Sequence, residues 1–421
     1  MTIARYVGLS AEESFNQKDN PPEADFHVDI TSATLDAPSD TQMFYGGGLQ
    51  RSAKVHRPGF YSPDGNIVYA FDVRTITYLL AWTLGGYMFT EDAEGLNTHE
   101  CYGSKDNILP SFVTRVGKDF FEHVFTGCVI DSLEIQVEDG FAVATATINA
   151  AQDAKDRLKE ISELSLPEEY PLAFHEVTAT KKDKDGNGED ISADVRSITI
   201  NINNNMDADQ GRGLGSRHPY RIIAGERETT ISKPLFYRGS GPLEELWGQE
   251  TGVSQGGPET FELELDFDGG EFGAIKLLFP RCIYTQVQQQ PSNRDITTQG
   301  TDVRALLGDE VELANGNGEK VETEVYAKVD NGEGRVMKDT LTYEVTFEEE
   351  NEEDNVDIAI YSDEEKENEV ETVTTGSGGT AIATLTRGDY WFTASKDGFE
   401  DYEGSFTVDA DKTVTFTLME V

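Results

Sequence analysis

The feature that most constrains the fold of this chain is an internal repeat. A shift of 165 residues, the spacing from Trp82 to Trp247, places residues 26–35 (FHVDITSATL) over residues 191–200 (ISADVRSITI). Within these ten positions an Asp, a Ser and a Thr coincide, and a Leu meets an Ile. Without any gap, three more matches follow, which pair Gly46 with Gly211, Gly48 with Gly213, and Leu49 with Leu214.

A second block of matches occurs at a shorter shift of 154 residues, the spacing from Cys128 to Cys282. It aligns residues 125–129 (FTGCV) with residues 279–283 (FPRCI). The chain has only three cysteines and three tryptophans, so matches at both residue types argue against coincidence. We therefore expect two copies of one fold, at residues 1–155 and 171–335, with a linker or helix at 156–170.

Each copy is predicted to consist mainly of strands. Alternating or β-branched residues predict strands at 28–35 and 195–203. The runs 129–137 and 141–148 flank the turn residues Glu-Asp-Gly, which predicts a β-hairpin. The stretch 36–63 is rich in glycine and proline, and we expect it to form an extended loop or a hairpin that leaves the sheet.

Helices are expected at three places. Apolar spacing over residues 72–87 predicts a helix that ends at Gly85 and Gly86. Its shorter counterpart in the second copy is 242–247, which has proline in the first turn. Residues 150–165, between the two copies, are also expected to be helical.

Residues 340–421 form a third unit with a different pattern. Short runs of alternating residues recur there at regular spacing, which is typical of a small β-sandwich. The predicted strands are 341–347, 356–361, 371–375, 380–385, 390–395, 404–408 and 413–418. This unit has roughly twice the net charge per residue of the preceding chain, so we expect it to face solvent most completely.

The charge balance restricts the classes of function. The chain has 79 acidic and 34 basic residues, a formal net charge of −45. Self-repulsion at this charge opposes a compact state at low salt, whereas molar salt shortens the Debye length to about 3 Å. A hydrophobic content of 37% is still sufficient for packed cores. We therefore expect a folded, salt-adapted (halophilic) protein that does not bind nucleic acid by counterion release.

The sequence lacks the signals of membrane insertion, secretion and catalysis. No apolar run is long enough to span a bilayer, and the start, MTIAR, lacks the apolar core of a signal peptide. Three cysteines do not make a disulfide scaffold, and no nucleophile elbow, phosphate-binding loop or zinc-protease motif occurs. We expect a protein that is not an enzyme, needs no cofactor, contacts no membrane and is made in a reducing cytoplasm.

The order of elements over about three quarters of the chain resembles the tail tube proteins of long-tailed phages and related archaeal viruses. The segments that give this resemblance are 5–15 (RYVGLSAEESF), 28–32 (VDITS), the helix ending at Leu84, and 195–204 (VRSITININN). Separately, residues 388–400 (GDYWFTASKDGFE) are similar to small Ig-like modules of the carboxypeptidase-regulatory type. The expected fold is mainly β with a few helices: two tandem tail-tube-type β-sandwich or barrel folds, and a C-terminal Ig-like β-sandwich.

The resemblance implies a structural virion protein, the major tail tube subunit of a siphovirus-like tail. Four strands per tube fold would give three double-copy chains about two dozen strands around a lumen. A homotrimeric, pseudo-hexameric ring is therefore expected, with a homohexamer as the alternative. The rings would stack, contact the tape measure, tail terminator and distal tail proteins, and let double-stranded DNA pass during genome ejection without specific binding. Assembly is expected in the host cytoplasm, with the Ig-like unit decorating the outside.

Basic residues are scarce enough for their placement to matter. Those beside the two glycine-rich loops are Arg51, Lys54 and Arg57, and Arg212, Arg217 and Arg221. One hypothesis is that they contact acidic surfaces of a neighbouring subunit or ring. The other is that they pair with nearby carboxylates of the same chain. The sequence favours neither.

A weak calcium-loop pattern occurs in the second copy. Asp183, Asp185 and Asn187 occupy its first, third and fifth positions, and Asp194 the twelfth. Asp stands there in place of the usual bidentate Glu, and no flanking helix is evident. Because a hairpin turn has the same composition, the pattern favours a turn over a metal site.

Three other functions compete with a tube. One is another structural subunit, of a baseplate, a distal tail or a surface layer. A second is a secreted hydrolase, which should have a signal peptide. A third is a glycan-binding surface protein, and its candidate aromatic platform is Tyr390, Trp391, Phe399 and Tyr402. We expect most of these four side chains to lie in the core instead.

Overall fold

The computed structural model shows two compact units, Met1–Met337 and Lys338–Val421. The regular structure of the described residues is almost all β-strand, with two α-helices and three short 3-10 helices. The predicted mainly-β class is therefore confirmed. The described residues are 6–28, 30–37, 40–45, 52–92, 95–166, 170–289, 298–308, 310–314, 318–338, 340, 342–351, 353–363, 366, 368–386, 388–408 and 412–420.

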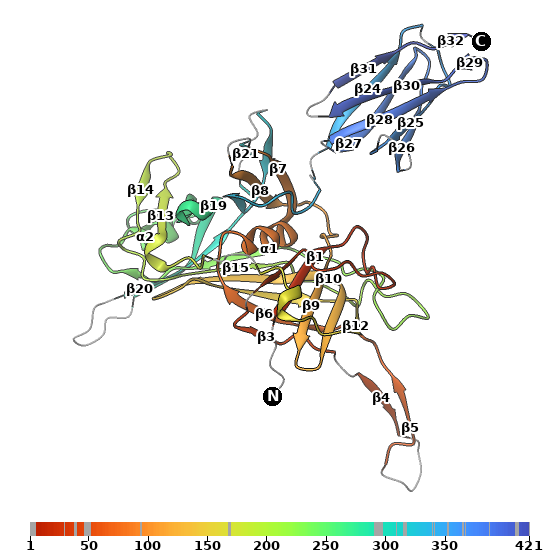
Figure 1. Ribbon diagram of the computed structural model, residues 1–421. Coiled ribbons are helices and arrows are strands. Elements are labelled where there is room, and N and C mark those ends of the chain that lie inside the picture. Colours follow the sequence, from red (N-terminus) through yellow and green to blue (C-terminus); the bar gives the residue numbers. More distant parts are fainter. Residues whose placement is uncertain are drawn as a thin grey trace. The chain divides into compact units, whose positions relative to one another are not determined.

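The first half of the larger unit contains twelve strands and one helix in its described residues, and Figure 1 labels most of them. In chain order they are β1 (Tyr6–Ala11), β2 (Phe26–Val28), β3 (Ser32–Ala33), β4 (Thr41–Phe44), β5 (Val55–Pro58), β6 (Asp64–Ala70), α1 (Thr75–Leu84), β7 (Gly85–Thr90), β8 (Asn97–Gly103), β9 (Phe112–Lys118), β10 (Phe121–Val137), β11 (Val143–Asn149) and β12 (Gln152–Asp156).

The second half of this unit repeats the pattern of strands around one helix. After 3-10 turns at Ile161–Glu163 and Phe174–Glu176 come β13 (Val177–Lys182), β14 (Gly188–Asp190), β15 (Ile198–Asn203), β16 (Glu228–Ser232), β17 (Leu235–Phe236), α2 (Gly241–Trp247), β18 (Phe261–Asp268), a 3-10 turn at Gly270–Phe272, β19 (Ala274–Gln289), β20 (Thr298–Ala305), β21 (Glu310–Glu312), β22 (Lys320–Glu322) and β23 (Tyr326–Asn331).

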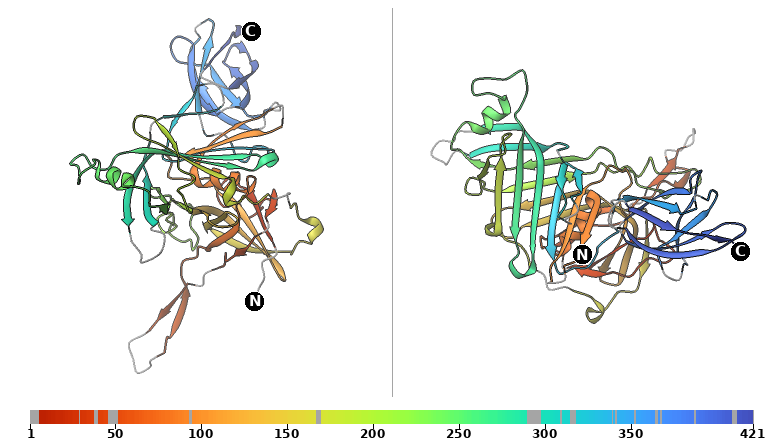
Figure 2. Two further views of the ribbon diagram at one scale, coloured as in Figure 1. Left: turned by 90° about the vertical axis from the view of Figure 1, so that its left-hand side faces the viewer. Right: turned by 90° about the horizontal axis from the view of Figure 1, so that it is seen from above.

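One antiparallel sheet runs through both halves of the larger unit. Its strand order is β3–β6–β11–β10 in the first half and β15–β16–β20–β19 in the second. The two blocks join where β10 pairs with β15. Each block therefore has the same order of four strands and ends on a long strand of 17 or 16 residues. Figure 2 shows strands of the second half lying side by side.

The first parts of the two long strands belong to a second pair of matching ladders. These ladders are β2–β1–β9–β10–β12 and β14–β13–β18–β19–β23. β23 also pairs with β8 of the first half, and β8 pairs with β7. Because the halves share these ladders, they lie within one compact unit. The boundary between copies at 156–170 stays a prediction.

Both long strands change register at matching places. In β10 the pairing shifts between Phe125 and Cys128, and in β19 it shifts between Phe279 and Cys282. The two thiols make the same contact: each Sγ donates to the carbonyl oxygen three residues earlier, at 3.4 Å for Cys128 and 3.8 Å for Cys282. The sequence match at 154 residues is therefore a match between two β-bulges.

Different residues make the two bulges possible. In β10, Gly127 has a φ of 61°, and a Cβ at this position would lie 2.8 Å from the Cβ of Ala151. In β19 the bulge contains Pro280, which has no amide to place in a ladder. A second register shift follows in each strand, at Ile130/Ser132 and at Tyr284/Gln286, again 154 residues apart.

The two matched tryptophans, in contrast, hold different positions in their helices. Trp82 lies three residues before Gly85, which ends α1 in a left-handed conformation with a φ of 80°. Trp247 directly precedes Gly248, the corresponding residue of α2. Trp82 is fully buried and stacks on Phe112 with ring centroids 4.3 Å apart, whereas Trp247 is half-buried. The repeat is therefore a property of the strands more than of the tryptophans.

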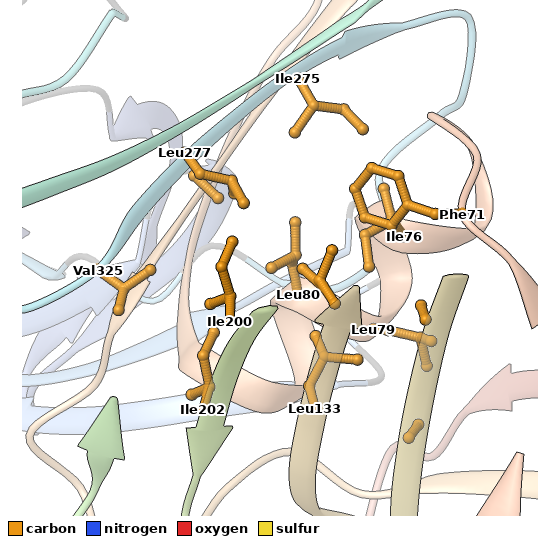
Figure 3. Close-up of a cluster of buried hydrophobic side chains, with 14 of the residues drawn as sticks. Phe71, Ile76, Leu79, Leu80, Leu133, Ile200, Ile202, Ile275, Leu277 and Val325 are labelled. Carbon is orange, nitrogen blue, oxygen red and sulfur yellow. The ribbon is translucent and has the colours of Figure 1, made fainter. Parts of the chain in front are cut away.

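Helix α1 is the centre of the main hydrophobic core. Its first turn is held by Asp72, whose Oδ1 accepts the amides of Arg74 and Thr75 at 2.8 and 2.9 Å. Figure 3 shows Leu79 and Leu80 of this helix beside Leu133 of β10 and the isoleucines of β15. The alternation of β15, Ile-Thr-Ile-Asn-Ile-Asn, places three isoleucines in that core and three polar residues on the other face. The predicted helices ending at Gly85 and at Trp247 are confirmed.

The predicted helix at 150–165 is wrong. Gln152–Asp156 form β12, which pairs with β10 along Glu122–Thr126, and Ile161–Glu163 form a single 3-10 turn. The described part of 156–170 contains no α-helix. The composition of this stretch suits a helix, but the open edge of β10 offers a full ladder of backbone hydrogen bonds, and this tertiary pairing outweighs local propensity.

The smaller unit consists of β-sheets around its own core. Its described strands are β24 (Thr342–Glu349), β25 (Asp357–Tyr361), β26 (Glu369–Thr374), β27 (Thr380–Thr386), β28 (Gly388–Ser395), β29 (Phe399–Glu400), β30 (Tyr402–Val408), β31 (Lys412–Phe416) and β32 (Met419–Glu420). The two main sheets are β27–β24–β31 and β26–β25–β28–β30, and β29 pairs with β32 in a third. All seven predicted strands are present, because their alternating apolar residues form this core. Tyr390 is buried, and Tyr402 is 37% exposed.

The contrast between the two tryptophans predicts unequal stability effects. Trp82→Ala removes a fully buried, stacked ring and should lower the free energy of unfolding by about 3–5 kcal/mol. Trp247→Ala, the matched control, removes a half-buried ring and should cost well under half of that. Guanidinium denaturation followed by circular dichroism measures both, and equal losses would contradict this assignment of the core.

Candidate assembly interface

The joint between the two four-strand blocks is a regular antiparallel ladder. It pairs Leu133 with Ile202 and Ile135 with Ile200 on the core face. On the other face Glu134 lies opposite Asn201. Alternation along both strands thus gives the sheet one apolar and one polar face. The sheet continues from the first half into the second through this ladder.

The polar face of this sheet consists mainly of neutral side chains, with Asp64, Glu134 and Asp302 as carboxylates. Its half-buried side chains in β10, β11 and β15 are Val143 and the polar residues Ser132, Glu134, Gln136, Thr145, Thr147, Asn149, Thr199, Asn201 and Asn203. Farther along, Arg304 of β20 pairs with Glu228 of β16 at 2.8 Å. In a chain of net charge −45, a broad face of small neutral polar groups differs from the rest of the surface.

A two-stranded hairpin, β4–β5, extends away from the sheets (Figure 1). Its ladder pairs Met43 with His56 and Phe44 with Val55. These apolar side chains are exposed, at 53% for Met43, 64% for Phe44 and 47% for Val55. An isolated two-stranded hairpin has marginal stability in water, and an exposed apolar surface of this kind is typical of a protein–protein contact.

The base of this hairpin is held by the loop 207–223 of the second half. The amide of Tyr61 donates to the carbonyl of Arg217 at 2.9 Å, and Nε of Arg217 donates to the carbonyl of Gly59 at 3.0 Å. The guanidinium of Arg212 lies over the ring of Phe60 at 4.4 Å from its centroid. The stretch 36–63 predicted to leave the sheet is therefore a hairpin with an anchored base.

These contacts divide the predicted basic residues into two groups. Arg212 and Arg217 contact the hairpin base, and Arg212 also pairs with Asp209 at 3.1 Å. Lys54, Arg57 and Arg221 have exposed side chains. Arg51, Gly46 and Gly48 lie outside the described residues. Arg217 is exposed as well, despite its contact with the hairpin base, and the interface role of the six residues stays a prediction.

The calcium-loop residues have partners within the chain. Oδ1 of Asp183 accepts the amides of Asp185 and Asn187, both at 2.9 Å, which is an Asx turn between β13 and β14. Asp194 pairs instead with Arg238 at 2.6 Å. Among the described residues, no group of three or more His, Cys, Asp or Glu side chains is placed to hold a metal ion.

A buried ion pair and a buried lysine contact other side chains of the larger unit. Arg115 pairs with the buried Glu122 at 2.6 Å, and Glu122 also accepts the hydroxyl of Tyr6 at 3.0 Å. Lys233 is fully buried, and its Nζ donates to Oη of Tyr284 at 2.9 Å. Burial, and then the charge of nearby Lys181, lower the pKa of Lys233 to about 7. Sequence reasoning did not single out Lys233, because nothing local distinguishes it from exposed lysines.

The exposed apolar residues of the hairpin were also not predicted from the sequence. Met43 and Phe44 lie beside the basic residues of the glycine-rich loop. The available signal was a pair of large apolar residues in a stretch otherwise rich in glycine and polar residues. Whether such a pair is exposed depends on the tertiary structure, and here nothing in the described chain covers it.

Comparison with known proteins identifies one family. A family model described as a phage tail tube protein matches residues 5–305. A search of curated proteins finds no match. The matched range contains both four-strand blocks of the polar-faced sheet and the β4–β5 hairpin. Of the helices in the described residues, none is long and apolar enough to cross a membrane.

The buried amine of Lys233 predicts a pH dependence of stability. The pKa is near 10.4 in the unfolded chain and about 7 in the native one, so between these values the unfolded state binds more protons and stability rises with pH. Relative to Lys233→Met, the free energy of unfolding of the native sequence should rise by about 1 kcal/mol per pH unit above pH 7. Denaturation curves at several pH values and constant salt measure this.

The exposed Lys184 provides the control for this measurement. Lys184→Met should leave the slope of the native protein unchanged, because its amine is not buried. Identical pH slopes for the native protein and Lys233→Met would show that Lys233 is charged in the folded state.

Proposed function

The chain belongs to the phage tail tube protein family, and from this premise we propose that it is the major tube subunit of a siphovirus-like tail. Family membership makes it a structural protein of the virion tail that assembles into a tube with other tail proteins. We propose further that copies close into rings, that rings stack, and that the tube conducts double-stranded DNA during genome ejection.

The observation that supports this proposal most is the repeated strand order of the main sheet. Two equal blocks of four strands continue into each other through β10 and β15. A repeat of this kind, extended over further chains, closes into a ring if each step turns by a constant angle. Three chains then supply about two dozen strands, enough to enclose a wide lumen. We therefore propose a homotrimeric, pseudo-hexameric ring, with a homohexamer as the alternative.

The polar face of the sheet suits the lining of a DNA passage. Double-stranded DNA binds proteins mainly through Lys and Arg contacts to phosphates. This face has Thr, Asn and Gln side chains, and Arg304 is paired with Glu228. DNA would therefore meet hydroxyls, amides and a few carboxylates, and would slide without specific binding.

The β4–β5 hairpin suits contact between stacked rings. It presents Met43 and Phe44 together with Lys54 and Arg57. Apolar burial would supply affinity, and the two cations would meet the acidic surface of the neighbouring ring. The anchored base at Tyr61 and Arg217 keeps the hairpin at a fixed position relative to the sheet.

The remaining assignments follow from the family and the composition. The tape measure, tail terminator and distal tail proteins are the proposed partners at the inside and ends of the tube, and assembly takes place in the host cytoplasm. The smaller unit, proposed as Ig-like, decorates the outside, where its charge faces solvent. The overall charge of −45 fits a halophilic host, because molar salt screens repulsion between subunits.

Electron microscopy of the purified protein tests the proposal directly. At about 1 M salt or above, where the Debye length is near 3 Å, we expect hollow tubes built of stacked rings. Dilution to about 0.1 M salt lengthens the Debye length to about 10 Å and should shift the material to single rings or monomers. Solid or sheet-like assemblies would favour a surface-layer or baseplate subunit instead.

The role of the hairpin is tested by charging its apolar pair. Phe44→Asp with Val55→Asp should leave the monomer folded, because both side chains are exposed. Tube elongation should require a protein concentration about tenfold higher or more, as expected when interface anchors are lost. Sedimentation and electron microscopy measure this.

A matched control charges two other exposed apolar residues. Phe120→Asp with Ile161→Asp alters side chains that are 91% and 83% exposed and lie outside the hairpin. Normal elongation is expected for this variant. If the hairpin variant also elongates normally, the hairpin does not join the rings.

A further inference from the structure

Two edges of the polar-faced sheet lack a strand partner in the described part of the chain. At the β3 end, segment 31–37 pairs with β6, where the amides of Thr34 and Asp36 donate to the carbonyls of Asn66 and Asp64 at 2.8 and 3.3 Å. Successive peptide groups of a strand point to opposite sides, so the amides of residues 33 and 35 face the open side. At the other end, residues 286–289 of β19 pair with β20 on one side.

The internal joint shows what fits such an edge. In β10, Leu133 and Glu134 are 154 residues before Val287 and Gln288, and this part of β10 is covered by β15. β15 in turn corresponds to the segment of β3 at the shift of 165 residues. β15, the strand that pairs with β10, is thus the counterpart of residues 33–37. The edge of β10 that β15 pairs with is the counterpart of residues 286–289.

Both open edges are nearly free of charge. The eight residues 282–289, CIYTQVQQ, contain no ionisable group other than a thiol and a phenol, and 30–37, ITSATLDA, contain one carboxylate. The chain as a whole is 27% charged. Soluble proteins usually protect an exposed strand edge with charged residues, especially Lys. Neither of these two edge segments contains a lysine, although Lys118 of β9 contacts the β3 edge, so two acidic chains add little like charge when they approach at these places.

We infer that β19 of one chain pairs with the β3 segment of a second copy, in the register of the internal β10–β15 joint. In this register Val287 lies opposite Ala37, as Leu133 lies opposite Ile202. Gln288 lies opposite Asp36, as Glu134 lies opposite Asn201. The inference rests on the proposed function, because it names the surface through which the proposed ring closes.

The side chains on both edges fit this register. Leu35 is buried in the core, as is its counterpart Ile200, so the second copy would extend the same apolar face. Asp36 and Gln288 are exposed, like the polar face to which they would belong. The open edge at Leu35 is capped in the monomer by Nζ of Lys118, which donates to its carbonyl at 3.3 Å. Pairing would replace that side-chain contact with a ladder of backbone hydrogen bonds.

Cysteine cross-linking tests the register in the full chain. Asp36→Cys with Gln288→Cys places two thiols directly opposite each other across the inferred joint, within the Cβ separation that a disulfide needs. Oxidation of assembled tubes should convert most chains to covalent oligomers on non-reducing gels. The single variants should remain monomeric, because the native cysteines Cys101, Cys128 and Cys282 are buried.

A control pair displaces one thiol along the same edge. Ser32→Cys with Gln288→Cys moves the first thiol four residues away on the same face, about 13 Å, beyond disulfide reach. Equal cross-linking of both pairs would overturn the register. Tubes that form normally but give no cross-link with Asp36→Cys and Gln288→Cys would overturn the inferred joint while leaving the proposed tube function intact. Failure of the unmodified protein to form tubes would contradict the proposed function itself.

Hydrogen exchange on the unmodified protein supplies a measurement that needs no variant. Assembly should slow exchange of amides in 33–37 and 286–289 by at least about tenfold, because each open edge gains backbone hydrogen bonds. The internal joint, at 133–137 and 198–203, is already paired and should change little. Unchanged exchange at both open edges in tubes would overturn the inference.

Discussion

The two long strands are the element on which the rest of the larger unit depends. β10 and β19 each belong to two ladders at once, and each passes from one ladder to the other at a bulge beside a buried cysteine. A bulge bends and twists a strand, so one continuous backbone serves two sheets that enclose a core. The helix α1 lies against β10 within that core and is buried on nearly every side. Because the same device occurs twice, the two halves present the same four-strand block.

The acidic composition and the strand edges act in opposite directions on assembly. A net charge of −45 keeps molecules apart unless salt screens it. The open edges at β3 and β19 and the apolar side chains of the β4–β5 hairpin contain few charged residues. A surface built in this way limits association to a few contacts. The polar face of the sheet, with Arg304 neutralised by Glu228, is kept free of groups that would hold phosphate.

The local sequence predicted secondary structure well where the apolar periodicity was strong. It predicted poorly where pairing with a distant strand determined the conformation. The seven strands predicted in the smaller unit followed from alternation, since each apolar residue of the pattern has one face to occupy. The segment 152–156 has a helix-forming composition, yet it is a strand because the edge of β10 is beside it. Trp82 and Trp247 matched in sequence but not in position, since helices of different length end at different distances from the aligned strands. Lys233 could not be picked out at all, because its burial comes from β19 and its surroundings, far along the chain.

The sequence alone determined the repeat, the mainly-β class, the C-terminal strands and the absence of familiar catalytic motifs. These properties are recorded in residue type and spacing, such as the two cysteines 154 residues apart, so no knowledge of distant contacts is needed to read them. The tertiary structure decided which strands pair, which edges stay open and which apolar residues remain exposed. Backbone hydrogen bonds are alike for every residue. The partner of β10, and the open second edge of β19 beyond its pairing with β20 in the described chain, can therefore be known only from the arrangement in space.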